Sequence, residues 1–166
     1  MTRGKGIGGG VPLSAILASK AASCFEHGDQ GGTYCGNPLV CAVGLAVMRT
    51  LIDPDFLAMA AHNAAFLREG LTDLSSQHGL GETRGSGFLL ALEVAPDTAP
   101  AIVARAMQVG LLINAPRPNC LRLMPALNIS LRDIETGLER LDEVIATMGR
   151  SPATRADSKL RRKGLE

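Results

Sequence analysis

Apolar residues recur at helical spacing in several stretches, and two of these stretches carry a clear start signal. Asn37-Pro38 places an N-cap residue before a proline at the first helical position, and Asp53-Pro54 repeats that arrangement. One apolar stripe covers residues 39–51, and the other covers residues 56–74 and stops before Gly79. The pattern predicts a buried helix after Asn37 and, after Asp53, a long amphipathic helix of about seven turns.

Strand patterns begin after residue 84. Residues 88–94 and 111–114 are short apolar runs bounded by turn residues, and each predicts a strand. A third strand is predicted over residues 120–124, where Leu121 and Leu123 fall on one face and Arg122 on the other. An arginine in an apolar strand is unusual unless the residue has a task or pairs with an acidic group at the sheet edge.

Two further helices accompany these strands. Asp97 is the expected N-cap of the first helix, and Gly110 is expected to end it. The last helix should begin after Ser130, with Asp133 in the reciprocal position of a capping box. Together the pattern predicts a small sheet that helices cover on one face.

The first third of the chain has weaker signals. Residues 13–18 are apolar and predict a short buried strand, and Ser19 is a plausible cap for a short helix through Phe25. The loop over residues 26–36 is rich in glycine and polar residues, a composition that suits a binding loop and a flexible connector equally well. At the other end, residues 151–166 have little to bury and are expected to form a disordered tail.

Composition narrows the functional classes. A net charge of +1 with scattered basic residues predicts no nucleic-acid partner and no anionic membrane partner. The chain shows no signal peptide and no apolar run near the roughly 20 residues that span a bilayer. Four cysteines without C-x-x-C spacing favour reduced thiols in the cytoplasm. His27, His62 and His78 lack metal-ligand spacing, so no metal site is expected.

Lys5 is the candidate for chemistry because it lies among five glycines within residues 2–12. A lysine amine attacks carbonyl compounds when its surroundings lower its pKa, and Schiff-base chemistry with pyridoxal phosphate is its usual use. Gly4, Gly6 and Gly9 match a G-x-G-x-x-G pattern, but no strand precedes them and no helix follows at once. The Walker pattern fails because a glycine follows Lys5. A solvated flexible terminus is the remaining alternative.

Two runs carry a family resemblance, namely KGIGGGVP at residues 5–12 and GDQGGTYCGNP at residues 28–38. They resemble the cofactor-lysine segment and the following loop of class III aminotransferases of the ornithine and acetylornithine type. The resemblance continues through RGSGF at residues 84–88 and LRLMP at residues 121–125, and so covers about residues 2–149. It is a resemblance to the C-terminal half of those pyridoxal-phosphate-dependent enzymes.

The resemblance implies an α/β fold, the C-terminal part of a fold-type I transferase. Residues 1–52 would end the large cofactor domain, residues 53–79 would form a connecting helix, and residues 80–150 would form a small α+β domain. The implied reaction transfers the terminal amino group of N-acetylornithine to 2-oxoglutarate in arginine biosynthesis. Another ω-amino donor (ornithine, succinylornithine or 4-aminobutyrate) stays open. So does a non-catalytic fragment, because the family's phosphate loop, ring-stacking aromatic and ring-nitrogen aspartate are not found in the sequence.

The same resemblance assigns site residues. Lys5 would hold the pyridoxal phosphate and shuttle a proton. Thr33 would reach the phosphate bound by a partner subunit, which implies a homodimer with shared active sites. Arg122 would bind the substrate carboxylate, for which the planar guanidinium fork is well suited. Arg84 fits a turn-anchoring arginine at least as well as a substrate ligand.

Overall fold

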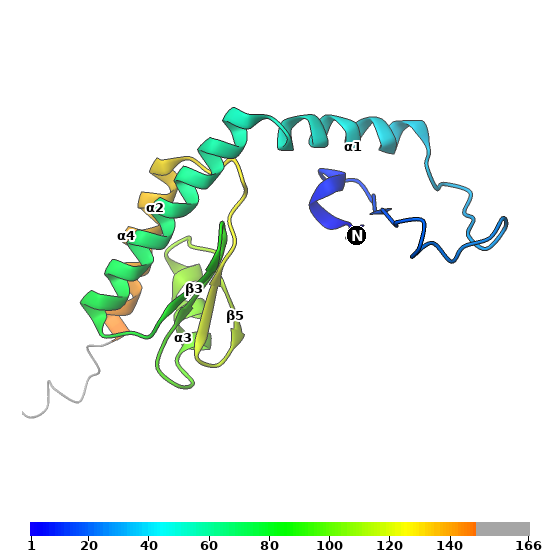
Figure 1. Cartoon of the computed structure of the whole chain (residues 1–166). Coiled ribbons are helices and arrows are strands. Elements are labelled where there is room, and N and C mark those ends of the chain that lie inside the picture. The colour runs from blue at the N-terminus through cyan, green and yellow to red at the C-terminus, as the bar shows by residue number, and fades with distance from the viewer. Residues whose placement is uncertain (149–166) are drawn as a thin grey trace, which may run out of the picture. The chain divides into compact units, whose positions relative to one another are not determined.

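The computed structural model describes residues 1–148, which divide into two compact units (Figure 1). The first unit is Met1–Leu57, and the second begins at Ala58. The division falls near the start of helix α2 (Pro54–His78). None of the helices within this described part is long and apolar enough to cross a membrane.

The first unit is built around a short turn that packs on a helix. Strands β1 (Thr2–Arg3) and β2 (Ala15–Ile16) pair antiparallel, and the 3-10 helix η1 (Lys5–Gly8) lies between them in sequence. Helix α1 (Pro38–Leu51) contacts η1. Because Gly44 of α1 has no side chain, Leu13 comes into the space that a Cβ atom there would occupy.

Both predicted helix starts in this region are confirmed. The Asn37 side chain accepts a hydrogen bond from the Val40 amide at 3.0 Å, which satisfies a free donor in the first turn of α1. Asp53 does the same for α2, because its carboxylate accepts from the amides of Asp55 (2.9 Å) and Phe56 (3.0 Å). These caps fix where both helices begin.

Two predictions for the first third are wrong. The strand expected over residues 13–18 is reduced to the two residues of β2, and Ile16 remains 66% exposed. The helix expected from Ser19 to Phe25 is a single turn, in which the Ser19 carbonyl accepts from the amides of Ala22 and Ser23. Within the described residues β2 pairs with β1 alone, so the sheet consists of two short strands. A seven-residue stretch is also too short to sustain a helix without packing.

The second unit has a four-stranded antiparallel sheet with the strand order β3-β4-β6-β5. Its strands are β3 (Thr83–Ser86), β4 (Leu89–Glu93), β5 (Asn114–Arg117) and β6 (Cys120–Leu123). Helices α3 (Ala99–Gln108) and α4 (Leu131–Met148) complete the unit with α2.

One face of this sheet forms the core of the second unit. The register places Leu92 opposite Leu121 and Leu90 opposite Leu123, so these leucines share a face. Leu90, Leu92 and Leu121 are almost fully buried in one cluster with side chains of α2, α3 and α4. The predicted alternation about Arg122 and the predicted cover of helices on one face are both confirmed. We call the opposite side, which carries Ala91 and Arg122, the open face.

Polar contacts tie the helices together. Buried Asn63 of α2 donates to the carbonyl oxygen of Ile129 at 2.9 Å, just before α4. His78 and Asp142 form a hydrogen bond between α2 and α4, with 2.5 Å between Nε2 and Oδ1. The capping box predicted at Ser130 is present in part. The Ser130 hydroxyl accepts from the Asp133 amide at 3.1 Å and donates to its carboxylate at 2.7 Å.

Three details of the second unit were not predicted correctly. The cap of α3 is Thr98 rather than Asp97, which instead takes a left-handed conformation with φ of 61°. Strand β5 begins where the expected strand over residues 111–114 ends, and it contains Pro116, which an edge strand tolerates. Strand β3 was not predicted because it contributes no apolar alternation. The tail expected over residues 151–166 lies outside the described residues.

We predict that Gly85→Ala destabilises the second unit by about 3 kcal/mol or more. Gly85 has φ of 127°, and an added Cβ would collide with the backbone carbonyl of Leu89. Gly87→Ala is the matched control, because Gly87 also has positive φ but open space around it, so its cost should be about 1 kcal/mol. Urea unfolding monitored by circular dichroism measures both values, and equal losses would contradict the prediction.

Candidate active site

Lys5 is the first residue of η1, and its side chain is exposed. Its φ of 54° is uncommon for a residue other than glycine. The turn is closed by Gly9, whose amide donates to the Gly6 carbonyl at 3.1 Å. A Cβ on Gly9 would lie 2.9 Å from Cγ2 of Val47 in α1, so only glycine lets the turn approach the helix this closely. Lys5 therefore projects from a turn that is packed on α1.

Thr33 lies in the loop before α1 and lines a pocket of about 430 Å³. The pocket is formed by residues 12–14 and by residues of the 32–41 segment, all within the first unit. Its hydroxyl groups come from Ser14, Thr33 and Tyr34. Asn37 secures the loop, because its side-chain nitrogen donates to the Tyr34 carbonyl at 2.9 Å. The arrangement can offer hydroxyl and turn N–H donors to an anion.

Arg122 lies on the open face of β6 and is half-buried. Its Nε donates to Oδ1 of Asn114 at 3.1 Å across the β5–β6 pair. Both residues line a pocket of about 270 Å³ with Leu112, Ile113 and Met124. An ion pair at the sheet edge was the alternative for Arg122. Among residues 1–148 no salt bridge involves Arg122, and its described side-chain partner is a neutral amide.

Arg84 lies in β3 with an exposed side chain. The expected alternative was that it anchors the turn at Gly85. The structure gives that contact to Arg68 of α2, whose Nη2 donates to the Gly85 carbonyl. Sequence reasoning missed both Arg68 and Asn114, because each acquires its role from a residue that the fold brings near it.

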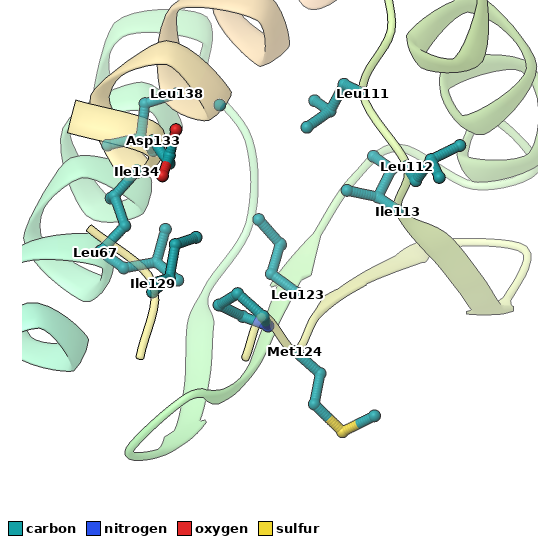
Figure 2. A pocket seen from close by; sticks show the side chains of 12 residues that line it. Leu67, Leu111, Leu112, Ile113, Leu123, Met124, Ile129, Asp133, Ile134 and Leu138 are labelled. Atoms are coloured by element: carbon teal, nitrogen blue, oxygen red, sulfur yellow. The ribbon is translucent and has the colours of Figure 1, made fainter. Parts of the chain in front are cut away.

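A separate cavity of about 200 Å³ lies in the second unit (Figure 2). Its lining is almost entirely aliphatic and comes from α2, α4 and the segments around β5 and β6, including Leu67, Leu123 and Leu138. Asp133 is its one ionisable side chain, and that carboxylate is engaged by Ser130. The cavity offers neither a nucleophile nor a cation, so we assign it to packing of the core.

The site residues thus form two sets, one in each unit. The first unit presents an exposed amine on a packed turn and a hydroxyl-lined pocket. The second presents a guanidinium group in a pocket on an open sheet face. These are the groups needed to attach a carbonyl compound, to hold a phosphate and to bind a carboxylate.

This chemistry agrees with the family to which the chain belongs, the class III aminotransferases, whose family model matches residues 1–145. The chain is therefore part of an enzyme of this kind, with the aminotransferase fold that the sequence motifs indicated. Acetylornithine aminotransferases are among its relatives. Acetylornithine aminotransferase 2 of Bordetella parapertussis is 52% identical over 151 residues, which cover 89% of this chain and 38% of the relative. The acetylornithine aminotransferase of Ralstonia nicotianae is 49% identical, covering 90% and 38%.

Solved structures of aminotransferases have a fold similar to that of this chain. N-acetylornithine aminotransferase from Stenotrophomonas maltophilia matches with a TM-score of 0.76 and 32% identity over 89% of this chain and 39% of that chain. Ornithine delta-aminotransferase from Plasmodium falciparum matches with a TM-score of 0.78 and 26% identity over 88% and 38%. The chain spans less than two fifths of the length of these relatives.

Proposed function

We propose that this chain supplies the cofactor lysine, the phosphate-binding loop and a carboxylate-binding arginine of an acetylornithine aminotransferase. The complete enzyme would transfer the terminal amino group of N-acetylornithine to 2-oxoglutarate in arginine biosynthesis. The observation that carries the proposal is the exposed Lys5, set on a turn packed against α1 in a chain about half identical to acetylornithine aminotransferases. Because the chain spans 38% of those relatives, turnover is proposed for an enzyme of full length.

The residues present fit the pyridoxal phosphate that the family implies. Lys5 offers an amine for covalent attachment, and its position on a closed turn limits how far the amine can move. Thr33 and Ser14 offer hydroxyl donors for a phosphate in one pocket. When bound, pyridoxal phosphate supplies an electron sink that makes the hydrogen on the amine-bearing substrate carbon acidic.

Lys5 would have a second task as an acid–base group. Its Nζ would take the proton from the substrate carbon that bears the amino group and would later return a proton. A flexible side chain on a fixed turn suits both tasks, because the turn keeps the amine near one place while the side chain can reorient. Arg122 would bind the substrate carboxylate through its two Nη groups, since Asn114 occupies Nε.

Assembly and location also belong to the proposal. Thr33 would bind the phosphate held by a partner subunit, which makes the enzyme a homodimer with shared active sites. The exposed Thr33 side chain supports this, because it remains available to a second copy. Free thiols at Cys24, Cys35 and Cys41 suit the reducing cytoplasm. Residues 1–52 would form the end of the large domain, and residues 80–150 would form the small domain. Residues 53–79 would form the helix that connects the two.

Ornithine is the second candidate donor. The similarity to Plasmodium falciparum ornithine delta-aminotransferase, at 26% identity, favours considering it. The two donors differ at the α-amino group, which is acylated in N-acetylornithine and charged in ornithine. Comparing kcat/KM for both donors discriminates between the proposals.

We predict that Lys5 is the residue that carries the cofactor. A suitable enzyme is a chimera in which this chain replaces the matching segment of the Bordetella parapertussis relative. Borohydride reduction with pyridoxal phosphate should fix the cofactor on Lys5, as peptide mapping would show, and Lys5→Ala should abolish turnover. Lys20→Ala is the control, because Lys20 is an exposed lysine of the same unit. An adduct found only on Lys20 would contradict the assignment of Lys5.

We predict that Arg122→Lys in the same chimera weakens binding of glutamate and 2-oxoglutarate by about 2 to 3 kcal/mol. Lysine keeps the charge but loses the paired N–H donors of the fork and the bond to Asn114. Steady-state kinetics with each substrate measures the change, while borohydride labelling of Lys5 should be unaffected. Unchanged Michaelis constants for both substrates would refute the role of Arg122.

A further inference from the structure

Two free cysteines of the first unit line the same pocket as Thr33. This pocket of about 430 Å³, which we call the Thr33 pocket, takes Cys35 from the loop before α1 and Cys41 from α1 itself. Both cysteines are exposed, and neither forms a disulfide. Cys24 is a third exposed cysteine of this unit, but it is not among the residues that line the pocket. The proposed function uses Thr33 for a phosphate and leaves the two neighbouring thiols without a role.

Cys35 belongs to the turn that presents Thr33. Its amide donates to the Gly32 carbonyl at 3.0 Å, and this hydrogen bond closes the four-residue turn in which Thr33 is the second residue. The sulfur atom lies back over the start of the turn, because a Cβ atom added to Gly32 would be 2.7 Å from Sγ of Cys35. Glycine leaves that space free for the sulfur. A group attached to Sγ would therefore lie beside the segment that carries the Thr33 hydroxyl.

The lining of the Thr33 pocket suits an exchange reaction of these thiols. Its ionisable side chains are those of Tyr34, Cys35 and Cys41, so no carboxylate among the described lining residues opposes a thiolate. The pocket volume falls within the roughly 300 to 1,000 Å³ that small-molecule sites occupy, so a small reagent can reach the exposed sulfur atoms. A phosphate and a group attached to sulfur would compete for the same space.

We propose that the Thr33 pocket is a thiol-modification site, in which a low-molecular-weight disulfide forms a mixed disulfide with Cys35 and the attached group excludes the phosphate. Cys41 is the second thiol that the reagent meets in this pocket. The inference rests on the proposed role of Thr33 as a phosphate ligand. It adds a means of closing that site by oxidation, which a thiol reductant reverses.

The exchange balances without a further reactant. Cys35 releases its proton to solvent, and its thiolate attacks one sulfur of the reagent. The S–S bond of the reagent breaks as the new S–S bond to Sγ forms, and the other half of the reagent leaves as a thiolate that takes up a proton. The protein sulfur is oxidised and the departing sulfur is reduced. Dithiothreitol removes the attached group by the same exchange and regenerates the Cys35 thiol.

The full 166-residue chain tests the proposal, with inorganic phosphate as the anion and 2-hydroxyethyl disulfide as the reagent. The group that this reagent attaches is uncharged, so a loss of phosphate binding reflects occupied space rather than added charge. Cys24→Ser combined with Cys41→Ser leaves Cys35 as the exposed thiol, and Cys35→Ser combined with Cys41→Ser leaves Cys24 as the matched control. Phosphate binding is measured by ³¹P nuclear magnetic resonance, and peptide mapping identifies the modified cysteine.

Modification of Cys35 should weaken phosphate binding about tenfold or more, because charge-assisted hydrogen bonds to the anion are lost, and dithiothreitol should restore it. Modification of Cys24 should leave phosphate binding unchanged. In the unsubstituted chain, saturating phosphate should slow the modification of Cys35 and Cys41 but not that of Cys24. Equal effects of modification at Cys35 and Cys24, or full phosphate binding after modification of Cys35, would overturn the proposal.

Thr33→Val separates this inference from the proposed function. If Thr33→Val weakens phosphate binding and modification of Cys35 does not, the role of Thr33 stands and the thiol site is wrong. If modification of Cys35 weakens phosphate binding and Thr33→Val has no effect, the thiol site stands and Thr33 is misassigned. If neither change affects phosphate binding, both proposals for this pocket fail.

Discussion

Burial of only one face of the four-stranded sheet is the constraint on which the rest of the second unit depends. Leu92 and Leu121 lie opposite each other in the core, so the residues between the buried leucines must face outward. Arg122 and Ala91 are placed on the open face by that rule alone. A slip of one residue between β4 and β6 would turn Arg122 into the core, where an unpaired charge is costly. The same strand register therefore determines both the packing of the core and the position of Arg122.

In the first unit, the backbone that carries Lys5 is packed while the lysine side chain stays exposed. Close packing of η1 on α1 achieves this, and it depends on glycines at the points of contact. Gly9 closes the turn and Gly44 receives Leu13, so the chain carrying Lys5 is fixed from both sides of the contact. The buried residues of this unit are Gly8 and Gly44, so the contact is made without a buried side-chain core. The glycines thus allow close packing of the turn on α1 and also leave free space around the lysine side chain.

Features encoded by neighbouring residues could be predicted from the sequence. The caps at Asn37 and Asp53 act over three positions, and the alternation around Arg122 acts over two, so both could be recognised directly. The strand expected over residues 13–18 was wrong because an apolar run does not reveal whether neighbouring strands will extend and cover it. Contacts formed only by folding, such as that between Asn114 and Arg122, left no local signal. The candidate lysine and arginine were accessible from motifs, but their supporting contacts were not.

We propose that Lys5 attaches the carbonyl cofactor, that Thr33 binds a cofactor phosphate and that Arg122 binds the substrate carboxylate. A crystal structure of the chimera with pyridoxal phosphate and 2-oxoglutarate tests it most directly. We expect that Nζ of Lys5 lies at the carbonyl carbon of the cofactor, that Thr33 contacts a phosphate held by the other subunit, and that Arg122 pairs with a carboxylate of 2-oxoglutarate. A structure in which another lysine meets the cofactor, or in which Arg122 faces solvent beside a filled substrate site, would contradict it.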